Sequence, residues 1–155
     1  MTNMIIPADH LKANRCTFSI NEPEFERYRF TIVRSRLPSM NANVVKQPFR
    51  GFTVPFPQDS VDYEDITFEF RVDEKMENWK ALYRWLISNA VAGDDARYCE
   101  GTMEIVDADN QPVISFHFKN SLITNLSGLD FDVTDTQNDT IIASCTIAYS
   151  HFEIS

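Results

Sequence analysis

The sequence predicts a mainly β protein with one α-helix, in which about seven or eight antiparallel strands form a barrel or a two-sheet sandwich. Short runs of alternating apolar and polar residues recur along the chain, and this is the period of a half-buried strand. Only residues 74–92 show the spacing of an amphipathic helix, which we expect on the flank of the sheets. A chain of 155 residues, 43% of them hydrophobic, is long enough for one core, so we expect a single domain over residues 1–155.

The first elements are an arm and two strands. Residues 1–14 show little periodicity, and we expect an extended arm there. Residues 16–20 predict a short strand, and residues 28–37 predict a second strand that forms a hairpin with it. The second strand ends near Leu37-Pro38, because proline lacks the amide donor that a sheet requires.

Residues 44–57 predict a projecting hairpin or two edge strands. The stretch is β-prone and aromatic, but three prolines and a glycine exclude it from the middle of a sheet. We expect the bend near Arg50-Gly51 and exposed side chains around it, which usually mark an interaction site. The alternative is a loop folded back over its own barrel. The residues expected at an interface are Phe49, Arg50, Phe52 and Phe56.

A strand at residues 66–72 leads directly into the helix. Asp73 is expected to cap the first turn, and Gly93 to end the helix in a left-handed conformation. The predicted buried stripe consists of Met76, Trp79, Tyr83, Leu86 and Ala90, flanked by Leu82 and Ile87. At about 100° per residue, Trp85 falls outside this stripe. Either a loop of the same chain covers its indole, or another subunit does.

The remaining strands follow the helix. Residues 102–106 and 113–118 predict a hairpin around a polar turn at residues 107–112. Residues 141–154 predict the longest strand, and both of its faces are apolar or small. We therefore expect this last strand to be central.

No pattern of catalytic or ligand-binding residues stands out, so we expect no enzyme, no cofactor and no metal. Residues 107–110 begin like a calcium loop, but Gln111 and Pro112 stand where a ligand and the obligatory glycine belong. The three histidines lack the spacing of a zinc site. The three widely spaced cysteines, Cys16, Cys99 and Cys145, predict buried thiols rather than a disulfide framework.

The formal net charge of −9 argues against a protein that grips nucleic acid, because phosphate binding needs a basic surface. The same charge would prevent DNA from adhering to a channel through which it slides. No run approaches the ~20 apolar residues of a membrane span, and the first residues do not resemble a signal peptide. We therefore expect a cytosolic origin and no membrane insertion.

Three segments, taken in order, carry a resemblance that spans nearly the whole chain. The first is Leu37-Pro38-Ser39 with residues 47–55, the second is residues 66–74 with Asn78-Trp79 and residues 83–86, and the third is residues 116–120 with residues 126–131 and 146–154. Together they resemble the tail tube proteins of tailed bacteriophages, a family that includes contractile-tail inner tubes and, more distantly, the inner tube of type VI secretion. One departure is Pro57-Gln58, where the family usually has Pro-Gly.

The resemblance implies a structural virion protein in the tail, assembled in the host cytoplasm. Copies would form hexameric rings that stack into a conduit for genome ejection. Residues 44–57 would contact the adjacent ring, and Trp85 would lie at a protomer contact. Other partners would be the tail sheath, the baseplate, the tape-measure protein and DNA in transient passage.

Two other functions remain open from the sequence. A tube initiator, a tube terminator or a baseplate adaptor can share this fold, although a single domain of this size favours the repeated tube subunit. A small-ligand-binding β-barrel belongs to another class of protein, and it would need an interior wide enough for a pocket.

Overall fold

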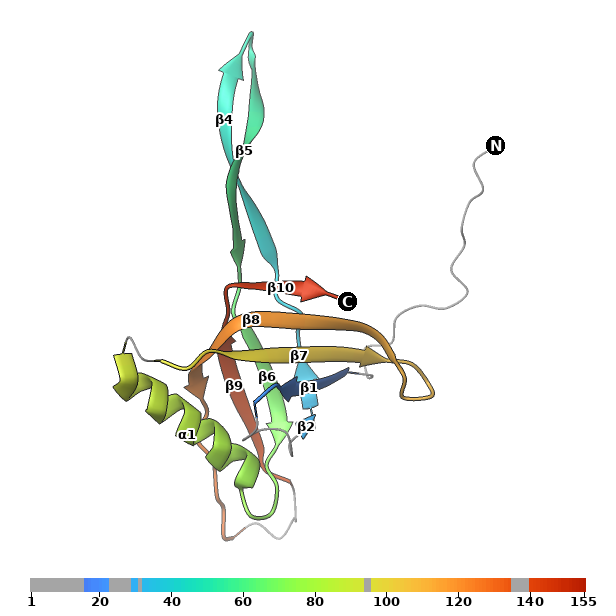
Figure 1. The fold of residues 1–155 in the computed structure, drawn as a ribbon, viewed down its shortest axis with the longest axis vertical. Helices are drawn as coiled ribbons and strands as arrows, with labels where there is room; N and C mark the ends of the chain where they lie inside the picture. The colour runs from blue at the N-terminus through green and yellow to red at the C-terminus, as the bar shows by residue number, and fades with distance from the viewer. Residues whose placement is uncertain (1–15, 23–28, 31, 94–95, 135–139) are drawn as a thin grey trace.

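The computed structural model describes residues 16–22, 29–30, 32–93, 96–134 and 140–155. Figure 1 shows a body of antiparallel strands, a helix on its flank and a long two-stranded ribbon that rises from the body. The predicted mainly β class, the flanking helix and the projecting hairpin are confirmed. The arm predicted at residues 1–14 lies outside the described residues.

The body is an eight-stranded antiparallel sheet folded into two layers. Its strands run in the order β2-β1-β7-β8-β9-β6-β3, and β10 pairs with β8 beside this path. Their bounds are β1 Cys16–Ile20, β2 Arg29–Phe30, β3 Ile32–Ser35, β6 Ile66–Arg71, β7 Cys99–Val106, β8 Pro112–Leu126, β9 Ile142–Ala148 and β10 His151–Ile154. The predicted strand at residues 28–37 is therefore divided. β2 pairs with β1 as predicted, whereas β3 pairs with β6 in the other layer.

Strand β8 joins the two layers because it bends in the middle. Its first half pairs with β7 and β10, and its second half pairs with β9. Asn120 stands at the bend with φ of 53°, and the Ser121 hydroxyl donates to the Phe118 carbonyl at 2.9 Å. A left-handed residue turns the strand at this point, as in a β-bulge.

The prediction that residues 141–154 form the longest strand is wrong. That stretch is divided into β9 and β10, and β8, with 15 residues, is longer than either. β9 pairs with the second half of β8, and β10 pairs with the first half. The chain must therefore change direction between β9 and β10, where β8 bends. Alternation of apolar residues continues through the break and does not reveal it.

Aromatic side chains fill the space between the layers. Phe18 of β1 stacks on Phe68 of β6, with ring centroids 4.4 Å apart, and Phe118 lies 6.4 Å from Phe18. A Cβ on Gly101 of β7 would lie 2.9 Å from the Phe18 ring, so any larger residue there would have to displace this buried ring. The interior is therefore a packed core.

Helix α1, Glu77–Ala92, begins three residues later than predicted. Met76 has φ of 57° and closes a turn by donating its N–H to the Asp73 carbonyl. The N-cap position is therefore Met76 and not Asp73 as predicted, although the Asp73 carboxylate still accepts the Glu77 N–H of the first turn at 2.8 Å. The helix ends at Gly93 as predicted, with a positive φ of 59°, although its ψ of −116° lies outside the left-handed helical region.

The predicted buried stripe of α1 is only partly correct. Met76, Trp79 and Leu86 pack against the core and Leu82 is fully buried, whereas Tyr83, Ile87 and Ala90 are exposed. The prediction that Trp85 lies outside the buried face is wrong. The buried residues are Asn78, Ala81, Leu82 and Trp85, while Tyr83 is 46% exposed. Trp85 is 1% exposed, and its indole N–H donates to the Arg97 carbonyl at 3.3 Å, so the chain itself covers the ring. Apolar residues occupy two faces of α1, and the buried Asn78 lies on the face that packs against the body. The Asn78 amide donates to the Arg71 carbonyl at 2.9 Å.

The projecting hairpin consists of β4, Met40–Phe49, and β5, Phe52–Tyr63, and is longer than predicted. Its two-residue loop is Arg50-Gly51, with φ of 46° and 88°, as a type I′ turn requires. Pairing runs from Phe49 opposite Phe52 to Val44 opposite Pro57. With hydrogen-bonded and non-bonded pairs alternating from the loop, all three prolines fall at non-bonded positions, where no ladder donor is lost.

Candidate assembly interface

The hairpin has one aromatic face. Residues directly opposite each other in an antiparallel pair point to the same side. The pairs on one face are Phe49 with Phe52, Gln47 with Val54, and Val45 with Phe56, and those on the other face are Pro48 with Thr53, Lys46 with Pro55, and Val44 with Pro57. Phe49, Phe52 and Phe56 are 55%, 58% and 49% exposed. The three phenylalanines therefore form one water-exposed surface, which we call the aromatic face.

The end of the hairpin is also cationic. Residues 44–57 contain Lys46 and Arg50 and no acidic residue, on a chain whose net charge is −9. The Arg50 guanidinium lies 5.5 Å from the centroid of the Phe49 ring, within the range of a cation–π contact. A partner of this surface would need apolar groups and carboxylates.

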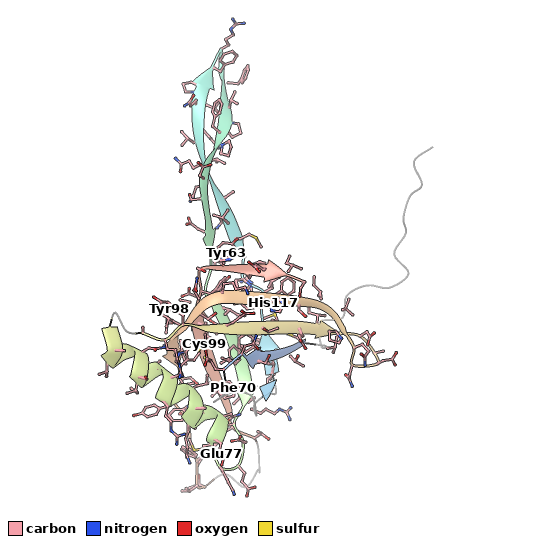
Figure 2. The ribbon with its side chains drawn as sticks, viewed as in Figure 1. Tyr63, Phe70, Glu77, Tyr98, Cys99 and His117 are labelled. Carbon is pink, nitrogen blue, oxygen red and sulfur yellow. The ribbon has the colours of Figure 1, made fainter. Side chains whose placement is uncertain are left out.

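Aromatic contacts fix the base of the hairpin to the body. Tyr63, the last residue of β5, lies where the hairpin meets the body (Figure 2). Its ring centroid is 5.9 Å from that of Tyr149 and 5.4 Å from that of Phe152. Further up the hairpin, Asn43 donates to the Ser60 hydroxyl at 2.9 Å and to the Asp62 carboxylate at 3.2 Å. These side chains bridge an irregular stretch of pairing between Ala42 and Val44. The hairpin is thus held in a defined direction.

Four of the five interface residues predicted from the sequence come together at the hairpin, namely Phe49, Arg50, Phe52 and Phe56. Trp85 does not join them, because it is buried in the body. The same hairpin exposes four further apolar side chains, at 39–49%, that were not among the predicted interface residues: Met40, Val44, Val45 and Val61. The run of alternating β-prone residues on both sides of the prolines could have included them.

The outer face of the layer formed by β1, β7, β8 and β10 carries a polar network. Lys119 donates to the Glu100 carboxylate at 2.9 Å and lies 3.9 Å from Glu153. His117 Nδ1 lies 3.3 Å from Glu100, and its Nε2 lies 2.8 Å from the Ser155 hydroxyl. The hydrogen bond to Glu100 raises the pKa of Lys119. The network joins three strands and keeps this face hydrophilic.

The described residues hold no group of three or more His, Cys, Asp or Glu side chains that could bind a metal ion. Cys16, Cys99 and Cys145 are free thiols. Burial raises the pKa of Cys99 to about 12 and also raises that of Cys145, so both stay protonated and unreactive.

Hollows lie outside the core. One, with a volume of about 590 Å³, opens beside Tyr98 and Leu122, and a second, of about 390 Å³, lies between them and Ala90 of α1. The aromatic core occupies the interior, which leaves the small-ligand barrel without support. None of the helices in the described part of the chain is long and apolar enough to span a bilayer.

Comparison with known proteins gives consistent matches. A family model described as T4-like virus tail tube protein gp19 matches residues 50–153. The tail tube terminator protein of Enterobacteria phage T4 is 24% identical over 156 residues, which cover 92% of this chain and 89% of the relative.

Solved structures share the fold at low sequence identity. The tube-terminating cap of the anti-feeding prophage matches with a TM-score of 0.73 and 15% identity, over 99% of this chain and 95% of that one. The sheath/tube terminator of an extracellular contractile injection system, PVC, matches with a TM-score of 0.68 and 14% identity, over 100% of this chain and 99% of that one. Hcp1 from Flavobacterium johnsoniae matches with a TM-score of 0.59 and 10% identity, over 91% of this chain and 94% of that one.

Proposed function

Because the chain belongs to the T4-like virus tail tube protein family, we propose that it is a structural protein of the phage tail whose copies form a ring that terminates the tail tube. The observation that carries the proposal is the match to the tail tube terminator of phage T4 over about nine tenths of both chains. From the sequence, the size of the domain favoured the repeated tube subunit. The terminator is of similar length, so size does not distinguish the two.

The hairpin supplies the contact along the tube axis. In a cyclic ring all copies point the same way, so every hairpin projects from one side of the ring. The aromatic face and the two cations then bind the neighbouring ring, while the other side of the ring has no hairpins to offer. A ring of repeated tube subunits would also carry its hairpins on one side, so the match to the tube terminator, and not the hairpin, carries the choice between the two functions.

The polar face of the β1, β7, β8 and β10 layer is the best candidate for the wall of the channel. Its residues are polar, among them Ser19, Glu104 and His117. With the net charge of −9, this surface lets DNA pass without adhesion. We further propose six copies in each ring, contacts with the sheath and baseplate, assembly in the host cytoplasm and no enzymatic activity.

The repeated tube subunit is the second candidate, since the matching family model describes a tube protein. The two functions differ in which sides of the ring bind another ring. A subunit accepts another copy of itself on both sides of the ring, and a terminator accepts the tube on one side only.

Electron microscopy of the chain with the tube protein of the same phage separates these functions. A gold-labelled terminator marks one end of each tube and, on its own, forms single rings at every concentration. A repeated subunit forms tubes that lengthen with concentration and carry label along their whole length. A monodisperse monomer with and without the tube protein would contradict both.

A further inference from the structure

Two surfaces of the body face in opposite directions, away from the hairpin. Figure 1 shows α1 on one side of the body and the turn between β7 and β8 on the other side. The hairpin rises between them. A surface on each side is what neighbouring copies in a ring would use, because each copy then contacts one neighbour with each side.

The side that carries α1 is apolar and basic. Tyr83, Ile87 and Val91 follow one another at a spacing of four residues and are 46%, 43% and 83% exposed. Lys80 and Arg84 are exposed beside them. Within the described part of the chain, no ion pair neutralises either cation. This face, which we call the outer face of α1, has no cover from its own chain.

The opposite side ends in a rigid acidic turn. The Asp107 carboxylate accepts the N–H groups of Asp109 and Gln111, both at 2.9 Å, and Asn110 has φ of 59°. These bonds fix the turn and leave the exposed Asp109 carboxylate at its tip. Val113, next to the turn, is 62% exposed. The tip is therefore preorganised, so less conformational entropy is lost when it binds.

We propose that the β7–β8 turn of one copy packs against the outer face of α1 of the next copy, with Asp109 facing Lys80 and Arg84 and Val113 facing the apolar stripe. The inference rests on the proposed function, because it names the contact that closes the ring. Opposite charges and exposed apolar residues match across the two surfaces. A contact between two different surfaces, repeated by rotation, closes into a ring and leaves the hairpins free for the neighbouring ring.

Charge reversal tests this contact. Arg84→Glu and Asp109→Lys each place like charges opposite one another, and the ring fraction measured by mass photometry should fall by about tenfold or more. The double variant restores opposite charges with reversed polarity, and its ring fraction should return to within roughly threefold of the unaltered chain. Lys75→Glu and Asp130→Lys make the same changes of charge on exposed residues outside both surfaces, and they should leave the ring fraction unchanged.

Each other outcome overturns the contact. Single variants that assemble like the unaltered chain would show that these surfaces do not meet. Loss in both singles without recovery in the double would show that each residue faces a different partner. Absence of rings from the unaltered chain, alone and with the tube protein, would refute the self-assembly in the proposed function, and the contact with it. That result differs from a failure of the contact alone.

Discussion

Replacing Phe52 by serine tests the aromatic face of the hairpin. Phe52 is 58% exposed, and its ring lies against that of Phe49, with 5.8 Å between the centroids. Burial of a whole phenylalanine removes roughly 150–250 Å² from water, so about 100 Å² of Phe52 remains to be buried on assembly. At about 25 cal/mol per Å², its loss costs about 2.5 kcal/mol of association free energy. The association constant for the contact of each hairpin with the neighbouring ring of subunits should fall roughly 60-fold.

The assay measures binding of the ring to tube ends by sedimentation over a range of protein concentration. The thermal midpoint of unfolding should stay almost unchanged, because the tip of the hairpin lies far from the core of the body (Figure 1). Val44→Ser is the matched control. Val44 is 49% exposed on the opposite face of the same hairpin, and its replacement should leave binding intact.

Two results would refute this reasoning. If Phe52→Ser bound tube ends with unaltered affinity, the aromatic face would not be the axial contact. If Val44→Ser weakened binding as much as Phe52→Ser, both faces of the hairpin would contribute equally, and the aromatic face would not be the specific contact.

Three predictions concern the body and are checked by urea or thermal unfolding. Trp85→Ala should destabilise the fold by about 3–5 kcal/mol, since Trp85 is 1% exposed, and unchanged stability would contradict its place in the core. Gly101→Ala should cost about 1–3 kcal/mol because its Cβ would lie 2.9 Å from the Phe18 ring, and Phe18→Leu should recover part of the loss. Burial raises the pKa of Tyr149 from 10.0 to about 12, so the stability it contributes is complete below pH 10 and is lost as the pH rises toward 12. Tyr149→Phe should remove that dependence and cost little at pH 7, since its buried hydroxyl has no hydrogen-bond partner among the described residues.

The hairpin could be predicted from the sequence because its signals are local. Prolines break the ladder wherever they occur, and Arg50-Gly51 allows the positive φ angles of a tight turn. Exposure of Phe49 and Phe52 follows from these two facts. The alternation in β6 and the polar turn between β7 and β8 are local signals of the same kind.

The buried face of α1 depended on tertiary contacts. Apolar residues lie on two sides of the helix, so counting at 100° per residue included the exposed Tyr83 and Ile87 and left out the buried Trp85. The Asn78 amide, bound to the Arg71 carbonyl, and the Arg97 carbonyl, bound to the Trp85 indole, determine which side faces inward. Both carbonyls belong to segments outside the helix, and periodicity within the helix carries no information about them.

The sequence by itself determined the fold class, the hairpin and its turn, because each of these depends on residues close together in the chain. Only the tertiary structure decided that β8 serves both layers, that Trp85 is internal, and that α1 and the β7–β8 turn lie on opposite sides of the body. These features arise from pairing between strands far apart in sequence. Their free energy comes from packing and hydrogen bonds that form only when the whole chain has folded.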